Sequence, residues 1–286
     1  MRPLRRYFYL YVLAVAVVLM ATTSLFFYYE KNDGPLDVHF LDVGQGDAIY
    51  ARTPSGKDIL IDGGPSKALL RRLSEVMPWY DRTIDVVIAT HPDADHIGGF
   101  PDLLNRYEVK SYFHSDVESK NSIDDEIRRI LDEEKIAVAV LSRGHRLDFR
   151  DGAHFDVLYP EAGAKASDIN ALSIVGALSY GSSTILLTGD APTSVERRII
   201  SLDSTSVRAE VLKVGHHGSK TSSGEEFLRY VAPRYAIISS GAGNRYKHPS
   251  EEALLRLKQQ GIMVLRTDTL GTIRMVLGRD SISLDN

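Results

Sequence analysis

From residue 90 to residue 99 the chain reads Thr90-His91-Pro92-Asp93-Ala94-Asp95-His96-Ile97-Gly98-Gly99, directly after the apolar run 85–89. That run predicts a buried strand, so two histidines and two carboxylates lie where the strand ends. Four such groups within six residues are costly to bury without a cation that neutralises them. Imidazole and carboxylate together suit divalent transition metals, so we expect a metal site here. The alternative is a solvated loop in which an Asp caps a helix, but such a loop requires neither both histidines nor this spacing.

Three further strand ends carry the same kinds of side chain. Asp190 follows the apolar run 185–187, where it is either the cap of the next helix or a metal ligand. His216 and His217 follow the run 210–214 and are bracketed by glycines, a setting in which histidines seldom serve packing. His248 precedes the predicted helix 250–260, where capping and a functional role both remain open. We therefore expect the chemistry of this chain to collect where its strands end.

The remainder of the chain alternates short β-type runs with helical patterns. Strands are expected at 36–43, 48–53, 59–61, 85–89, 136–140, 155–159, 172–180, 184–187, 210–214, 235–239, 263–266 and 272–277, and helices at 66–77, 122–134, 193–201, 224–231 and 250–260. Antiparallel meanders mixed with strand–helix units predict an α/β (α+β) fold of two mixed sheets covered by helices.

Several motifs together resemble the C-terminal domain of the ComEC family of DNA-uptake competence proteins, a branch of the metallo-β-lactamase fold. They lie at 40–48, 60–64, 91–99, 170–173, 188–190, 216–219 and 248–249. The resemblance runs from about residue 36 to residue 277. It implies a four-layer αββα metallo-β-lactamase sandwich at 35–286, with its site along one edge of the two sheets.

The resemblance also implies two divalent metal ions, Mn²⁺ or Zn²⁺. The expected metal ligands are His91, Asp93, Asp95, His96, Asp190 and His216, with His217 left open as the alternative to its neighbour. In this scheme His91 and Asp93 hold one ion, Asp95 and His96 hold the other, and Asp190 bridges the two.

Two positions depart from the general superfamily pattern. Asp93 stands where the second histidine of the His-x-His-x-Asp-His signature is usual, and Asn170 stands where many members have a further histidine. The ComEC branch resembles this chain in both positions, so they indicate a different metal rather than a dead site. More oxygen and less imidazole shift the preference from Zn²⁺ toward Mn²⁺.

The expected chemistry is hydrolysis by a water that lies between the two ions, loses its proton near neutral pH and attacks in line. The expected catalytic residues are Asp95, His217 and His248, and either histidine is suited to protonate the leaving oxygen. The expected substrate-binding residues are Ser219, Lys220, Lys247 and Asn170, with Arg245 beside them. A solvated face explains these cations equally well. The turn at 44–47 either buttresses the site or is a plain tight turn.

Residues 7–29 form an uncharged, largely apolar run, long enough to span a bilayer as a helix. Tyrosines lie at both ends and three arginines precede the run, which predicts a cytoplasmic N-terminus and an extracytoplasmic 36–286. A cleaved signal peptide is the alternative, but its apolar region is shorter and ends in small residues rather than in Phe-Phe-Tyr-Tyr. We therefore expect residues 1–34 to comprise a cytoplasmic N-terminus, a single-pass anchor in the cell membrane and a linker to the rest of the chain. With one span, the chain is not expected to be a DNA channel by itself.

Composition narrows the functional classes. The chain has no cysteine, which excludes a disulfide-linked partner and a thiol nucleophile, and its net charge of −4 excludes a basic nucleic-acid coat. The leading hypothesis is a metal-dependent phosphodiesterase or nuclease outside the membrane, with DNA and competence or cell-surface machinery as candidate partners. The alternative is hydrolysis of another surface phosphodiester, such as a choline or teichoic-acid ester, because the net charge of −6 beyond residue 34 gives no strong nucleic-acid footprint. An intact ligand set disfavours a non-catalytic binding module, and two missing histidines disfavour β-lactam hydrolysis.

Overall fold

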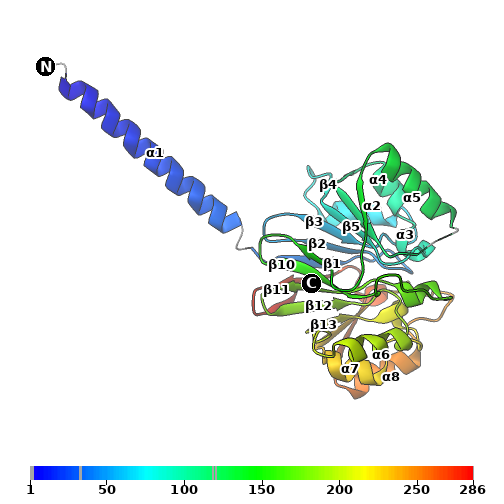
Figure 1. The fold of residues 1–286 in the computed structure, drawn as a ribbon. Coiled ribbons are helices and arrows are strands. Elements are labelled where there is room, and N and C mark those ends of the chain that lie inside the picture. The colour runs from blue at the N-terminus through cyan, green and yellow to red at the C-terminus, as the bar shows by residue number, and fades with distance from the viewer. Residues whose placement is uncertain (1–2, 32–33, 118, 120, 286) are drawn as a thin grey trace.

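The computed structural model describes residues 3–31, 34–117, 119 and 121–285. Two β-sheets pack face to face, and helices cover the outer face of each sheet (Figure 1). The first sheet has the strand order β17-β16-β1-β2-β3-β5-β7-β8. Its strands are β1 (Leu36–Phe40), β2 (Ile49–Arg52), β3 (Asp58–Ile61), β5 (Val86–Ala89), β7 (Ser111–His114), β8 (Ala137–Val140), β16 (Ile273–Leu277) and β17 (Ile282–Asp285).

The second sheet has the strand order β15-β14-β13-β12-β11-β10-β9. Its strands are β9 (Arg146–Asp148), β10 (Ala153–Tyr159), β11 (Val175–Tyr180), β12 (Ser183–Leu187), β13 (Val211–Lys213), β14 (Tyr235–Ile238) and β15 (Met263–Arg266). Strands β9 to β12 pair antiparallel, and β12 to β15 pair parallel. Two short strands, β4 (Thr83–Ile84) and β6 (Glu108–Val109), pair separately.

Three hydrophobic clusters separate the layers. The first lies between the sheets and includes Phe40 and Phe155. The second lies between the first sheet and α2 (Ala68–Val76), α4 (Phe100–Leu104) and α5 (Ser122–Glu133). The third lies between the second sheet and α6 (Thr193–Leu202), α7 (Glu225–Val231) and α8 (Glu251–Gln259). Three buried layers between four layers of elements confirm the αββα sandwich. The short helices are α3 (Ala94–Ile97), α9 (Thr267–Leu270) and two 3₁₀ turns, Ile169–Leu172 and Gly215–Gly218.

Strand direction divides the sandwich into two edges. Strands β1, β3 and β5 run the same way, because β1 and β3 are both antiparallel to β2 and β5 is parallel to β3. The loops after these strands, together with those after β12, β13 and β14, form what we call the His–Asp edge. The opposite edge, which we call the turn edge, contains the turns 53–57, 78–81, 149–152, 181–182 and 278–281.

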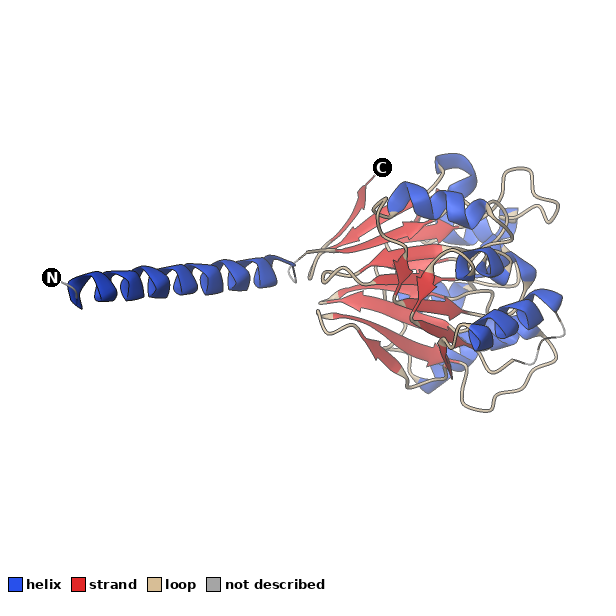
Figure 2. Ribbon diagram, turned by 90° about the horizontal axis from the view of Figure 1, so that it is seen from above, coloured by secondary structure: helices blue, strands red, loops and turns tan. Residues whose placement is uncertain are grey.

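Helix α1 (Pro3–Lys31) projects away from the turn edge, where β1 begins (Figures 1 and 2). Its segment Tyr7–Ser24 has a mean hydropathy of 1.8 and is not buried against the rest of the protein. By length and composition this segment is able to cross a membrane, and an N-terminal signal sequence passes the same test. The linker expected before residue 35 includes residues 32 and 33, which lie outside the described residues.

Most expected elements are present, and the differences are at short or polar segments. Strands β7, β9 and β17 were not expected, because each has five residues or fewer and mixes polar with apolar side chains, which gives a weak period. The strand expected at 172–180 begins only at Val175, since a 3₁₀ turn precedes it.

Candidate metal centre

Three loops of the His–Asp edge interlock through their backbones. The N–H of Gly64 donates to the carbonyl of Asp47 (2.7 Å), and the N–H of Asp47 donates to the carbonyl of Asp95 (3.2 Å). The contact is so close that a Cβ on Gly46 would lie 2.2 Å from the carbonyl oxygen of Asp95, and a Cβ on Gly99 would lie 2.2 Å from that of Gly63. Only glycine fits these two positions, and the loops are therefore held in one arrangement.

Asp62, at the end of β3, orients the two buried histidines of the stretch 90–99. Its carboxylate accepts from the N–H (2.8 Å) and the hydroxyl (2.7 Å) of Thr90, and it lies 2.8 Å from Nδ1 of His96. Because the hydroxyl proton of Thr90 goes to Asp62, its oxygen is left to accept from Nδ1 of His91 at 3.0 Å. In their neutral form both rings then carry the proton on Nδ1, which leaves each Nε2 to bind a cation or a second proton.

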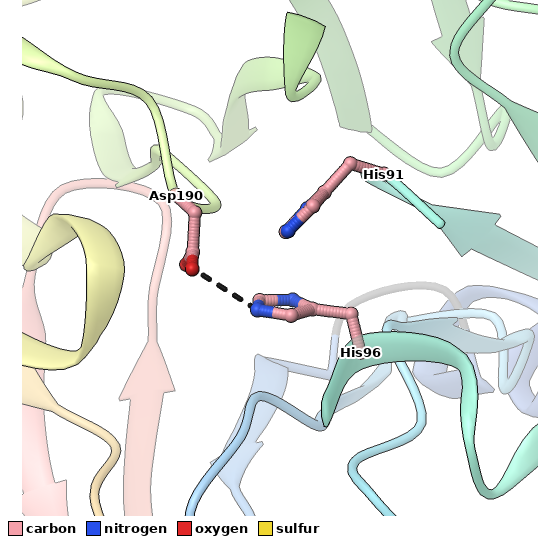
Figure 3. A group of neighbouring side chains, drawn as sticks. All are labelled: His91, His96 and Asp190. Carbon is pink, nitrogen blue, oxygen red and sulfur yellow. Dashed lines mark ion pairs between the residues drawn. The ribbon is translucent and has the colours of Figure 1, made fainter. Parts of the chain in front are cut away.

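Asp190 lies opposite these rings, after β12 (Figure 3). It is buried, and its Oδ1 is 3.3 Å from Nε2 of His96. The capping interpretation fails, because the N-cap of α6 is Pro192 and no side chain caps that helix. Asp190 is thus a buried carboxylate that faces histidines rather than a helix end.

His217 and His216 differ in the carboxylates that lie close to them. His217 is buried, its Nδ1 donates to the carbonyl of Ser239 (3.0 Å), and its Nε2 lies 3.3 Å from Asp95 and 3.7 Å from Asp190. His216 has a side chain that is 31% exposed, and its Nε2 lies 3.6 Å from Asp190. Both residues have left-handed backbones, with φ of 53° and 50°, a conformation that non-glycine residues adopt at some cost and that is common at functional sites. The geometry brings His217 between two carboxylates and leaves His216 at the opening.

A buried ion pair that was not predicted from the sequence lies behind His217. The Nζ of Lys213, a fully buried lysine at the end of β13, is 2.7 Å from Oδ2 of Asp47. The other oxygen of Asp47 is 3.2 Å from Nδ1 of His217. Lys213 thus balances a carboxylate that would otherwise add a further negative charge to the centre. The signal was available, since Lys213 interrupts an apolar strand directly before the two histidines.

Buried atoms without a hydrogen-bond partner converge at this edge. They include Nε2 of His91, His96 and His217 and Oδ1 of Asp190. Two groups have one ligand atom from each member within 4.8 Å of one another, namely His91, His96 and Asp190, and Asp95, His96 and His217. Native proteins rarely leave such atoms unpaired, so their convergence indicates a ligand, and imidazole nitrogens beside carboxylates indicate a divalent cation.

The pKa shifts describe how the edge balances its charges without a cation. Burial lowers the pKa of His91 to about 3. Burial opposes protonation of His217, yet Asp190 and Asp47 outweigh it and raise its pKa to about 9. Asp190 and Asp62 likewise raise the pKa of His96, and burial of Asp190 is outweighed by His217 and His96, which lower its pKa. Protons on His96 and His217 thus do what a cation would do beside Asp190.

The remaining expected site residues lie around this core at different depths. Asp93 has a side chain that is 42% exposed, 3.7 Å from Nε2 of His91. The ring of His248 lies 5.6 Å from that of His216. Lys220 and Lys247 are exposed, Ser219 is buried with its hydroxyl 2.9 Å from that of Thr221, and the N–H of Asn170 donates to Asp168. These contacts involve the hydroxyl of Ser219 and the backbone N–H of Asn170, and the substrate-binding roles expected for the two residues stay predictions.

Comparison with known proteins shows the family of this chain. A family model described as the metallo-beta-lactamase superfamily matches residues 41–242. The chain is 35% identical over 272 residues to ComE operon protein 3 of Bacillus subtilis, a match that covers 87% of this chain and 34% of that protein. It is 31% identical over 248 residues to competence protein ComA of Neisseria gonorrhoeae, a match that covers 84% of this chain and 32% of that protein. The chain therefore spans about a third of the length of these relatives.

A solved structure shows the same fold at low sequence identity. The metallo-beta-lactamase fold protein YhfI of Bacillus subtilis superposes with a TM-score of 0.57 and 14% identity, covering 82% of this chain and 96% of that one. At this identity the likeness extends to the sandwich and not to its activity.

Proposed function

Because this chain belongs to the metallo-β-lactamase superfamily and has competence proteins among its relatives, we propose that it is a binuclear metal-dependent phosphodiesterase that acts on DNA. The observation that carries the proposal is the convergence of three unpartnered Nε2 atoms and an unpartnered Asp190 oxygen in a buried, carboxylate-rich edge. The names of the relatives make DNA the first substrate to test.

We assign the ligands by what each residue reaches. His91 and Asp93, 3.7 Å apart, would hold one ion, and Asp95, His96 and His217 would hold the other. Asp190 faces both groups and would bridge them. His217 takes the place that was expected for His216, because His217 alone of the two lies beside Asp95. When bound, two divalent ions would activate a water for attack at neutral pH and would offset the charge on the phosphoryl oxygens.

The protein's own groups prepare this chemistry. Asp62 and Thr90 fix the rings of His96 and His91, so that little reorganisation is needed when cations bind. Asp47 and the carbonyl of Ser239 do the same for His217. His248, at the open side and next to His216, is the group that we assign to protonate the leaving oxygen. Arg245, Lys220 and Lys247 are exposed and suited to hold phosphates of the substrate.

The test uses the full chain in detergent, stripped with a chelator and reloaded with Mn²⁺ or Zn²⁺. We expect about two ions per chain and hydrolysis of single-stranded DNA and of bis-p-nitrophenyl phosphate. Elemental analysis that finds at most one ion would contradict the binuclear assignment. Turnover of p-nitrophenylphosphorylcholine with no cleavage of DNA would replace DNA by a choline-type surface ester.

A paired substitution tests the second ion. His217→Ala should lower the metal content to about one ion per chain, and His216→Ala should leave it near two, because only His217 lies among the carboxylates. The reverse outcome would return the ligand to His216.

We also propose that α1 anchors the enzyme in the cell membrane, with the sandwich outside the cytoplasm. The arginines before the apolar segment support this orientation. A reporter fused after Asn286 that is active only in the cytoplasm would contradict it.

A further inference from the structure

The turn 78–81 carries two exposed aromatic side chains at its tip. The N–H of Asp81 donates to the carbonyl of Pro78 (2.9 Å), which closes a β-turn with Trp79 and Tyr80 as its central residues. Trp79 is 87% exposed and Tyr80 is 70% exposed, and their rings meet edge to face at 5.7 Å. Trp79 is the chain's only tryptophan. Tryptophan and tyrosine are the residues that membrane proteins place at membrane–water interfaces, and here both are exposed to solvent side by side.

The turn is held firmly, so the exposure is built into the structure. The carboxylate of Asp81 accepts from the N–H of Thr83 (3.1 Å), at the start of β4, and pairs with Arg52 of β2 (3.5 Å). The preceding residue of the loop, Met77, is buried in the cluster beneath α2. The two aromatic rings therefore project from an anchored base and do not fold back onto the protein.

The position of this turn determines which surface it is able to contact. It precedes β4 and β5 and so lies on the turn edge, the edge from which α1 departs (Figures 1 and 2). Across the sheet, β1 and β5 are three strand spacings apart, or about 14 Å. Along the chain, α1 ends at Lys31 and β1 begins at Leu36, a link of at most about 17 Å when fully extended. If α1 spans a bilayer, the turn is within reach of the headgroups.

We propose that Trp79 and Tyr80 insert into the lipid–water interface and form a second membrane contact besides α1. The pair and the helix together fix the orientation of the sandwich, so that the turn edge faces the bilayer and the His–Asp edge faces away from it. The contact is apolar, because the charges beside it already have partners: Asp81 pairs with Arg52, Asp85 pairs with Lys110, and Arg82 donates to the hydroxyl of Tyr107 (3.0 Å). Binding therefore does not require anionic lipid. A protein that docks on the same turn is the competing occupant, and the test below separates the two.

The unique tryptophan makes the test direct. The full chain is reconstituted in phosphatidylcholine vesicles with and without lipids brominated on their acyl chains, and tryptophan emission is recorded. We expect bromolipid to lower the emission of Trp79 by about twofold or more. The emission maximum of Trp79 should also be blue-shifted relative to that of tryptophan in water, as for an interfacial indole. Tyr80→Ser should reduce the quenching, because it removes half of the aromatic pair.

The matched control moves the probe to the other edge. In Trp79→Phe/Tyr246→Trp the only indole lies next to His248, at a position that is 51% exposed, and bromolipid should quench it little. Flotation of Trp79→Ala/Tyr80→Ala with vesicles reports α1 separately, so that failure of the anchor and failure of the aromatic contact are distinguishable. Unquenched Trp79 in floating protein would overturn the proposal and leave the turn to a protein partner. Equal quenching at both positions would overturn the orientation.

Discussion

The two edges of the sandwich treat polar groups in opposite ways. At the turn edge, the turns of both sheets satisfy one another. Asp151 accepts from the N–H and the hydroxyl of Ser55, Lys57 donates to the carbonyl of Phe149, and the N–H of Ser182 donates to the carbonyl of Arg279. At the His–Asp edge, polar atoms are buried and left unpaired. Among the described residues, all buried side-chain atoms without a hydrogen-bond partner lie on that edge except Nε of Arg256.

The contrast shows where groups that are unfavourable for folding are concentrated in this structure. Buried carboxylates, unpaired imidazole nitrogens and left-handed histidines are each unfavourable for folding, and they are concentrated where a cation would make them favourable. The turn edge has no such concentration among the described residues, and its hydrogen bonds stabilise the fold. Changes at the two edges should therefore affect different properties.

The largest effect is expected from Asp190→Asn. Removal of the charge that we propose to bridge the two ions should lower hydrolysis of bis-p-nitrophenyl phosphate by about 10³-fold or more, about 4 kcal/mol, while thermal unfolding of the metal-free protein stays cooperative. The control is Asp203→Asn, at a carboxylate that accepts from the backbone of Thr205 and Ser206 and from the hydroxyl of Thr205 in a surface loop, and its activity should match the wild type. Activity of Asp190→Asn within a few-fold of wild type would remove Asp190 from the centre.

The second effect compares two ion pairs of equal length. Lys213 and Asp47 are 2.7 Å apart and buried, and Lys110 and Asp85 are 2.7 Å apart with Lys110 half-exposed on the turn edge. Lys213→Met should lower the free energy of unfolding by about 3 kcal/mol, because it removes the lysine that balances the buried carboxylate of Asp47. Lys110→Met should cost about 0.5 kcal/mol. Denaturant unfolding measures both, and Lys213→Met/Asp47→Asn should recover part of the loss; equal costs for the two single variants would abolish the contrast.

The third effect is a pH dependence that reverses when metal binds. In the metal-free protein the pKa of His217 is raised to about 9, and that of His96 is also raised. The stability that the His217 proton contributes is fully present below pH 6.5 and is lost as pH rises through 9, on the order of 3 kcal/mol. Metal binding requires both histidines deprotonated, so metal-loaded protein should gain stability over the same interval. Melting temperatures between pH 6.5 and 9, with EDTA and with Mn²⁺, should slope in opposite directions; parallel slopes would mean that these histidines are not ligands.

The smallest effect belongs to the turn edge. Asp151→Asn weakens bonds to Ser55 and Ala153 and should cost about 1 kcal/mol of stability. Turnover should stay within about twofold, because no residue of the metal centre touches this turn. A large loss of turnover measured well below the melting temperature would show that the edges are coupled.

The fold and the approximate location of the site could be predicted from the sequence, because strand ends and glycine-containing turns are determined by residues that are close together in the chain. The stretch 90–99 and Asp190 were both predicted, and they meet at 3.3 Å between His96 and Asp190. What could not be predicted is pairing across the two sheets. Asp62 and Asp47 were part of recognised motifs without a role, since their partners are 34 and 170 residues away in the chain. The choice between His216 and His217 likewise depends on backbone angles that adjacent histidines do not encode.

The glycine contacts at positions 46 and 99 have a consequence for evolution. A side chain at either position would collide with a neighbouring carbonyl oxygen whether or not the protein has any activity. Selection for the sandwich alone would therefore retain these glycines in a descendant that had lost its catalytic function. The histidines and aspartates have no such second protection, since their burial is unfavourable without a cation. A homologous chain that retains the glycines but lacks the carboxylates would therefore retain the fold and not the reaction. The glycines and the carboxylates of one motif are thus retained for different reasons.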